Sequence, residues 1–153
     1  MFVCGKHHIG PDVHAVLAET GDAHVVCLVE RHELLHRYDG YVEWLDGANG
    51  DDATWFEIHD MNPPRFDDGL RLFTRLAGML SSGRNIVIHC AAGIGRAGTT
   101  AAGTLMVMGL HSAEAAVAHV GAHRPMAGPQ TMSQQVFLQE LETHLRGVSS
   151  RLS

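Results

Sequence analysis

The amino-acid sequence predicts a single α/β domain with a mainly parallel central sheet of about four to five strands and helices on both faces. Three observations support this fold class. Short apolar runs alternate with helical patterns along the first part of the chain, an order typical of parallel sheets. Only helical patterns follow the last of these runs. The chain has 153 residues, 45% of them hydrophobic, which is enough for one domain with a proper core.

Four apolar runs are predicted to form the strands. The last three are rich in β-branched or aromatic residues, which favour strands. In chain order the runs are Phe2–Cys4, His24–Val29, Thr54–Ile58 and Asn85–His89. In such a sheet the functional loop lies at the carboxyl end of its strand.

Four segments show helical patterns. Phe66–Ser82 repeats apolar residues at helical spacing and carries acidic residues in its first turn. Gly98–Leu110 has almost no charge, which predicts a central buried helix. Ser112–His123 is stopped by Pro125, and Thr131–Leu145 closes the domain. We therefore expect one domain over residues 1–146 and a frayed tail over 147–153.

The most informative segment is residues 86–98, where an apolar strand runs directly into a cysteine, a loop of small residues and an arginine. A loop between a strand end and a helix start can direct backbone N–H groups at one centre, and the helix N-terminus adds partial positive charge. Cys90, at the base of this loop, is a candidate nucleophile. The planar fork of Arg96 can hold two phosphoryl oxygens. The candidate phosphate-binding residues are Ala91, Ala92, Gly93, Ile94, Gly95 and Arg96.

This Cys-x5-Arg arrangement, with His89 before the cysteine and Gly98 two residues after the arginine, resembles the signature loop of protein tyrosine and dual-specificity phosphatases. The resemblance extends from about His24 to Leu145. It implies a tyrosine-phosphatase-like fold and a phosphomonoester hydrolase that acts on phosphotyrosine, and on phosphoserine or phosphothreonine, of proteins. It further implies a phosphocysteine intermediate on Cys90, no cofactor, and a positioning role for His89.

Phosphoryl transfer from an ester also needs an acid that protonates the leaving oxygen. Asp60 follows a strand end and precedes a proline-stiffened turn, where the resembled family carries its mobile acid loop. That family usually has proline directly before the aspartate, whereas this chain has His59. A plain turn residue is the alternative interpretation of Asp60. The helix start explains Asp67 and Asp68, and the facing of the strand residue Glu57 is not decided by the sequence.

Two glutamines are candidate supporting residues. Gln130 and Gln134 resemble the glutamine-bearing loop with which some tyrosine phosphatases position water against the phosphocysteine. Thr131 and Gln134 also form a Thr-x-x-Gln capping box, which explains Gln134 equally well. Gln130 lies outside that box and is the better functional candidate.

Ala97 departs from the family pattern, since Ser or Thr normally follows the arginine and donates a hydrogen bond to the thiolate. Thr99 or Thr100, one helical turn onward, is a candidate replacement. There are two alternatives to an active protein phosphatase, and Ala97 motivates the first. One is a catalytically weak or inactive phosphate-binding module. The other is a phosphatase for a non-protein phosphomonoester such as a phosphoinositide, although loops for such substrates tend to carry lysines, which this loop lacks.

The composition excludes several other function classes. The formal charge is −6 and no Lys/Arg cluster occurs, so neither a nucleic-acid nor a membrane partner is indicated, and phosphorylated proteins are the expected partners. The N-terminal residues lack the pattern of a signal peptide, and three cysteines in no paired pattern suit a cytoplasmic protein. Oligomeric state is not predicted.

The remaining histidines and cysteines have ordinary explanations. The pairs His32/His36 and His119/His123 have ligand spacing but no third partner, so we predict solvated histidines and no metal site. Cys4 and Cys27 are explained as small apolar core residues. Some members of the resembled family carry a protective cysteine on the second strand, but a one-residue slip would reverse the facing of Cys27.

Overall fold

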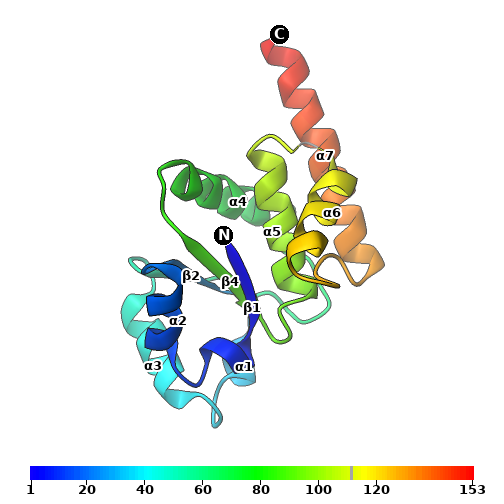
Figure 1. Ribbon diagram of the computed structural model, residues 1–153. Coiled ribbons are helices and arrows are strands. Elements are labelled where there is room, and N and C mark those ends of the chain that lie inside the picture. The colour runs from blue at the N-terminus through cyan, green and yellow to red at the C-terminus, as the bar shows by residue number, and fades with distance from the viewer. Residues whose placement is uncertain (111) are drawn as a thin grey trace.

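The computed structural model describes residues 1–110 and 112–153. Its centre is a four-stranded, all-parallel sheet with strand order β1-β4-β2-β3 (Figure 1). The strands are β1 (Phe2–Gly5), β2 (His24–Cys27), β3 (Ala53–Trp55) and β4 (Ile86–Cys90). The predicted α/β class and parallel sheet are confirmed, and all four predicted strands exist.

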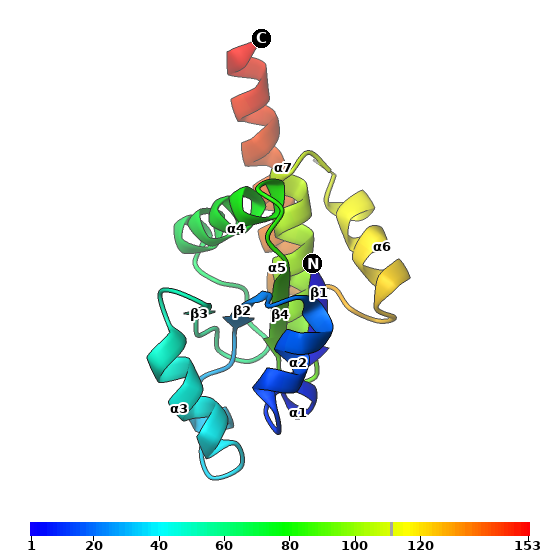
Figure 2. The same ribbon diagram turned by 60° about the vertical axis from the view of Figure 1, so that its left-hand side comes forward.

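Seven α-helices and one short 3-10 helix lie in the described residues. They are α1 (Lys6–Ile9), α2 (Val13–Thr20), η1 (Arg31–Glu33), α3 (Asp39–Ala48), α4 (Phe66–Ser81), α5 (Gly95–Val107), α6 (Ala113–His123) and α7 (Met132–Leu152). Figures 1 and 2 show α1 to α3 on one side of the sheet and α4 to α7 on the other. The predicted arrangement of helices on both faces is therefore confirmed.

Helix α5 is the central buried helix that the sequence predicted. It packs against β1, β4, α4, α6 and α7, and small residues along it permit this crowding. A Cβ on Gly98 would lie 2.1 Å from the backbone nitrogen of Gly128, so only glycine fits there. The helix begins at Gly95 rather than Gly98, because the Gly98 N–H already donates to the Ile94 carbonyl at 2.9 Å. Arg96 therefore lies in the first turn.

The three N-terminal helices were not predicted, although α2 carries clear end signals. The side chain of Asp12 accepts a hydrogen bond from the Ala15 N–H at the start of α2, and Gly21 ends the helix in the left-handed region with φ 66°. Helix α3 contains Gly40 and Gly47, which weaken helix propensity, and its apolar pattern was not recognised.

Element ends differ from the predictions at several further places. Strand β2 ends at Cys27 rather than Val29, and α5 ends at Val107 rather than Leu110. Strand β3 stops at Trp55, although the Phe56 N–H still donates to the carbonyl of Cys27, the last residue of β2, and the Ile58 N–H donates to that of Leu28. Helix α7 continues past Leu145 through residues 147–152, the segment for which a frayed tail is predicted. No proline follows Leu145, and a single glycine within a helix is tolerated.

Bilayer-spanning helices need both length and apolar character. No helix within residues 1–110 or 112–153 combines the two.

Candidate active site

Cys90 is the last residue of β4 and is 3% exposed. Because β4 lies between β1 and β2, the cysteine stands near the middle of the carboxyl edge of the sheet. The loop from Ala91 to Ile94 then connects it to the N-terminus of α5. The fold thus places the predicted nucleophile and the predicted anion-binding loop where parallel α/β sheets carry ligands.

The carbonyl groups of Ala91, Ala92 and Gly93 accept hydrogen bonds from residues outside the loop. The Ala91 carbonyl accepts from the Lys6 N–H at 3.0 Å, the Ala92 carbonyl from an Arg124 terminal nitrogen at 2.8 Å, and the Gly93 carbonyl from Arg124 Nε at 2.6 Å. In a trans peptide the next N–H points opposite to the carbonyl. The N–H groups of residues 92–94 therefore point the other way, and no described group accepts from them. Such a set of free donors has the chemistry of an anion site, as the sequence predicts for this loop.

Gly93 meets two requirements at once. Its φ is 71°, in the left-handed region, and a Cβ there would lie 2.3 Å from the carbonyl carbon of Cys4 at the end of β1. Any other residue would push the loop away from β1. Arg124 was not predicted as a site residue, and the one available signal was a charged side chain directly before Pro125.

Arg96 is only 2% exposed, and both of its terminal nitrogens are hydrogen-bonded within the protein. Its two terminal nitrogens donate to the two carboxylate oxygens of Glu33 at 2.8 Å each, and one of them also donates to the Ile58 carbonyl at 2.9 Å. Burial works against the charge, but the hydrogen bond and charge of Glu33 outweigh it and raise the pKa of Arg96. Burial likewise opposes ionisation of Glu33, yet the bond from Arg96 leaves its pKa lowered. The pair stays ionised, and the arginine is aimed before any ligand arrives.

Glu33 was missed by the sequence analysis. It is the last residue of η1, whose start has reciprocal capping by Glu30 and Glu33, and it follows the carboxyl end of β2. Two glutamates three residues apart directly after a strand were the available signal. That signal indicates a helix start, and only the tertiary structure brings Glu33 to Arg96.

Asp60 lies beside Arg96, with 3.3 Å between its Oδ1 and a terminal nitrogen of the arginine. Its side chain is 63% exposed, so it can reach an incoming ligand. His59, which precedes it, pairs through Nδ1 with Glu30 Oε2 at 3.1 Å. The structure therefore places the three predicted groups Cys90, Arg96 and Asp60 at the same edge of the sheet.

The loop that carries Asp60 is fastened to the start of α7. Thr131 Oγ1 donates to the Met61 carbonyl at 2.9 Å, and Gln134 Nε2 donates to the Asn62 carbonyl at 3.4 Å. Thr131 also caps α7 by accepting from the Gln134 N–H at 3.3 Å. The N-terminus of α7 thus serves both as a helix start and as an anchor for the acid loop.

The two glutamines differ in their surroundings. Gln134 is buried beside Gly95, and its Oε1 accepts from the Gln130 N–H at 2.7 Å rather than closing the predicted capping box. The Gln130 side chain donates to the carbonyls of Met126 and Gly128 at 3.1 Å and 3.2 Å. Both side chains lie next to the first turn of α5, and both form hydrogen bonds with backbone groups.

His89 is fully buried and has a hydrogen bond on each ring nitrogen. Nδ1 lies 3.3 Å from the Cys90 carbonyl and Nε2 lies 2.6 Å from the Tyr41 hydroxyl. A carbonyl can only accept, so Nδ1 carries the proton and Tyr41 donates to Nε2. Burial lowers the pKa of His89 to about 4, so the ring is neutral near pH 7. Tyr41 was not predicted, because its contact spans 48 positions of sequence.

Two buried histidines, His24 and His89, should make the fold less stable in acid. Burial, aided by Arg84 and Arg75, also lowers the pKa of His24 to about 4, against 6.5 for an unfolded chain. As the pH falls, each histidine takes up its proton in the unfolded chain before it does so in the folded protein. The free energy of unfolding should therefore have its full value above pH 6.5. It should fall between pH 6.5 and 4 by up to about 1.4 kcal/mol per pH unit for each histidine.

Urea titrations at pH 7, 6 and 5 measure this loss before the carboxylates protonate. The control variant His14→Gln, at an exposed position on α2, should leave the slope unchanged. A free energy of unfolding that stayed constant from pH 7 to 5 would contradict neutral burial of His24 and His89.

Neither of the other cysteines faces Cys90. In the sheet register Cys4 and Cys27 both pair with His89, whereas Cys90 pairs with Gly5. Paired residues share a face and successive residues alternate, so Cys4 and Cys27 belong to the opposite face from Cys90. Burial raises the pKa of Cys4 to about 11 and that of Cys27 to about 12, which keeps both protonated. All three cysteines are free.

The described residues contain no group of three or more His, Cys, Asp or Glu side chains arranged to hold a metal ion. The rings of His119 and His123 lie side by side on α6, with centroids 4.7 Å apart and planes tilted by 36°. His36 lies outside any helix with φ 66°, so it does not share a helix face with His32.

The comparisons with known proteins agree with this geometry. A family model described as "Swiss Army Knife protein, DSP-PTPase phosphatase domain" matches residues 2–144. Among solved structures, Tk-PTP in its active form is 28% identical over 88% of this chain and 86% of its own, with a TM-score of 0.72. The comparison with curated proteins gave no match.

Two more distant structures share the fold. PTPMT1 is 16% identical over 93% of this chain and 89% of its own, with a TM-score of 0.74. Kinase associated phosphatase is 21% identical over 95% of this chain and 84% of its own, with a TM-score of 0.73.

Proposed function

The chain belongs to the dual-specificity and tyrosine phosphatase family and is a cysteine-dependent phosphatase. On this premise we propose that it hydrolyses phosphotyrosine in proteins, with phosphoserine and phosphothreonine as further substrates. The observation that carries the proposal is the loop itself. The carbonyls of residues 91–93 are bonded to Lys6 and Arg124, and the N–H groups of residues 92–94 are therefore free beside Cys90 and Arg96. The neutral side chains of Ala91, Ala92 and Ile94 suit a monoester on a protein.

In the proposed mechanism the thiolate of Cys90 attacks phosphorus in line, and the bond to the leaving oxygen breaks. The loop N–H groups and Arg96 hold the three equatorial oxygens, over which the transition state spreads its charge. No described residue accepts from Arg96 Nε, so this donor is available to the phosphate. Asp60 protonates the leaving phenol or alcohol, then takes a proton from the water that cleaves the phosphocysteine.

The supporting residues act through these groups. Glu33 and the Ile58 carbonyl orient Arg96, while His89 and Arg124 orient the backbone of the loop. Gln134 holds the acid loop from the start of α7, and Gln130 lies beside it. For Gln130 we propose a supporting role at the water-attack step. No step in this scheme uses a cofactor.

One assay panel tests the substrate class. Phosphotyrosine, phosphoserine and phosphothreonine peptides are compared with soluble phosphoinositides, with EDTA present in a parallel series. We expect the highest kcat/KM for phosphotyrosine and no effect of EDTA. A preference for phosphoinositides would overturn the proposal, and PTPMT1, which was crystallised in complex with PI(5)P, shows that this fold holds such a ligand. Loss of activity with EDTA would contradict a metal-free mechanism.

Ala97 favours a second candidate, a phosphate-binding module with weak turnover. Ala97 is fully buried in the first turn of α5, where it offers no hydroxyl. The hydroxyls of Thr99 and Thr100 have no hydrogen-bond partner among the described residues, so neither donates to Cys90 here. The thiolate therefore lacks one hydrogen bond to a charged group, which is worth about 1.5–3 kcal/mol.

This missing donor should make breakdown of the phosphocysteine the slow step. We expect a pre-steady-state burst of phenol from an aryl phosphate in the parent protein. Ala97→Ser should raise the steady-state rate and reduce the burst, because the new hydroxyl makes the thiolate a better leaving group. Stopped-flow absorbance measures both quantities. The matched control Ala102→Ser adds a hydroxyl at another buried position of α5 and should change neither. A parent without a burst and an Ala97→Ser variant without a gain would contradict this prediction.

We also propose a cytoplasmic location with phosphorylated proteins as partners. The support is chemical, because a thiolate nucleophile and three free cysteines need a reducing compartment.

A further inference from the structure

Three exposed methionines border the catalytic site, and together they are called the methionine rim below. The side chains of Met61, Met126 and Met132 are 55%, 74% and 73% exposed, although methionine is usually a core residue. Their places beside the catalytic groups follow from the hydrogen bonds of the segments that carry them.

Met61 and Met132 lie next to Asp60. The Met61 N–H donates to Asp60 Oδ1 at 2.9 Å, so this residue touches the predicted acid directly. The Met61 carbonyl accepts from Thr131 Oγ1 at 2.9 Å, and Met132 directly follows Thr131 as the first residue of α7. One rim residue therefore comes from the acid loop and a second from the helix start bonded to that loop.

Met126 lies at the edge of the phosphate-binding loop. Two residues before it, Arg124 Nε donates to the Gly93 carbonyl at 2.6 Å. Two residues after it, the Gly128 N–H donates to the Ile94 carbonyl at 3.0 Å. Because both bonds end on the phosphate-binding loop, the backbone of Met126 is held beside that loop.

The fold does not explain why two of these positions carry methionine. Met61 and Met126 have φ of 67° and 69°, in the left-handed region that glycine and asparagine adopt more readily. The other non-glycine residues with positive φ in the described chain are Asp22 and His36, residue types that are enriched there. A methionine that is exposed and in an unfavourable conformation contributes little to folding, so a role at the surface accounts for it better.

The surroundings of the methionine rim are uncharged and stiff. Residues 61–64 and 125–135, which carry the rim, contain no charged side chain. They contain four of the five prolines of the chain, and proline fixes φ. Methionine side chains are flexible and polarizable and adapt to apolar partners of different shapes. The rim therefore combines a rigid backbone with adaptable apolar side chains.

A peptide whose phosphate lies on the loop has to lay the residues next to its phosphorylated residue over this border. We propose that the methionine rim binds an apolar side chain of the substrate, next in sequence to the phosphorylated residue. This inference rests on the proposed function and narrows its substrate class to phosphoproteins with a large aliphatic or aromatic residue at that place. A charged residue there would lose water without gaining an ion pair, so it is disfavoured.

Three phosphotyrosine peptides test the preference. They carry leucine, glutamine or glutamate on both sides of the phosphotyrosine and are otherwise identical. Calorimetry with the Cys90→Ser variant, which lacks the nucleophile but keeps the loop N–H groups, measures binding without turnover. We expect the leucine peptide to bind about tenfold more tightly than the glutamine peptide, the size expected for partial burial of one leucine side chain. The glutamate peptide should bind no more tightly than the glutamine peptide.

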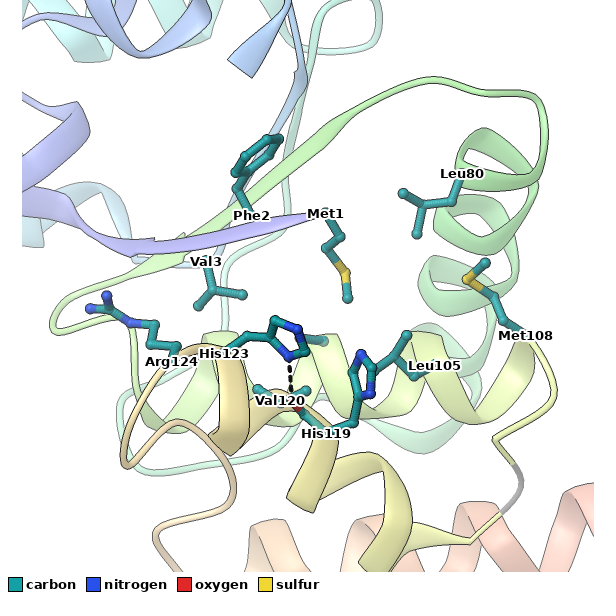
Figure 3. A pocket seen from close by; sticks show the side chains of 11 residues that line it. Met1, Phe2, Val3, Leu80, Leu105, Met108, His119, Val120, His123 and Arg124 are labelled. Atoms are coloured by element: carbon teal, nitrogen blue, oxygen red, sulfur yellow. Dashed lines mark hydrogen bonds between the residues drawn. The ribbon is translucent and has the colours of Figure 1, made fainter. Parts of the chain in front are cut away.

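Variants of exposed methionines locate the preference. Adding Met126→Gln and Met132→Gln to Cys90→Ser should make the leucine and glutamine peptides bind equally, and vanadate titration reports whether the anion site is intact. The matched control is Met108→Gln, at the far end of α5 and about 20 Å along that helix from the catalytic loop. Figure 3 shows Met108 near Leu80 in the wall of a cavity that neither Cys90 nor Asp60 lines. This control should keep the full preference for leucine.

Equal binding of the leucine and glutamine peptides to Cys90→Ser would overturn the proposal, even if the active protein hydrolyses both. A preference that survives Met126→Gln with Met132→Gln, or tighter binding of the glutamate peptide, would also overturn it. Faster hydrolysis of phosphoinositides than of peptides, with the leucine preference intact, would overturn the proposed function but support the docking surface. If the double variant lost only phosphoinositide hydrolysis, the methionines would serve lipid chains and the proposal would be wrong.

Discussion

Replacing Cys90 by serine should abolish turnover while phosphate and vanadate still bind. The hydroxyl of serine is not ionised near pH 7 and cannot attack phosphorus at a useful rate. The loop N–H groups and Arg96 are untouched, so the anion site remains. Release of phosphate from an aryl phosphate measures the first effect, and calorimetric titration with vanadate measures the second.

The matched control is Cys4→Ser, the same change in β1 on the opposite face of the sheet. It should retain most of the parent activity, because the thiol of Cys4 is held protonated by burial. Hydrolysis by Cys90→Ser at nearly the parent rate would move the nucleophile elsewhere. Loss of vanadate binding in a folded Cys90→Ser variant would contradict an anion site built from backbone donors.

Asp60→Asn should slow hydrolysis of a phenyl phosphate by roughly 10²–10⁴-fold, the usual contribution of general acid catalysis. The loss should shrink for substrates with acidic leaving groups, which need less protonation. The fall of kcat on the alkaline side, where the acid loses its proton, should also disappear. Initial rates for a series of aryl phosphates across the pH range measure all three effects.

The matched control is Asp67→Asn, which removes an exposed carboxylate from the first turn of α4. Its rate and pH profile should equal those of the parent. If Asp60→Asn also kept the parent profile, the acid would lie elsewhere, and Glu57→Gln would be the next variant to measure.

The parts of the site that the sequence predicted are the parts built from neighbouring residues. Cys90, the loop and Arg96 lie within seven positions of each other, and the strand before them and the helix after them are local patterns. Asp60 could be predicted as the acid because a strand end and a proline-stiffened turn mark its place. The α/β class followed in the same way from the alternation of strands and helices.

The parts that were missed depend on contacts between distant segments. Glu33 meets Arg96 across 63 positions, Tyr41 meets His89 across 48, and Arg124 meets Gly93 across 31. Each is a polar side chain in or next to α3, η1 or α6, and its partner is decided by how these elements pack in the folded chain. Local sequence patterns do not predict such pairs, because the distance between two residues far apart in the sequence is set by the whole fold.

The fastening of the acid loop has a thermodynamic consequence. Ile58, Met61 and Asn62 each give a carbonyl to a side chain from another element, and no ligand is needed for these bonds. A loop ordered in this way has already lost its conformational entropy during folding, at about 1–2 kcal/mol per residue. Substrate binding then does not have to supply that free energy. More of the binding energy then remains for the transition state. A variant that lacks one of these hydrogen bonds should have to order the loop on binding, and its apparent affinity for substrate should be weaker.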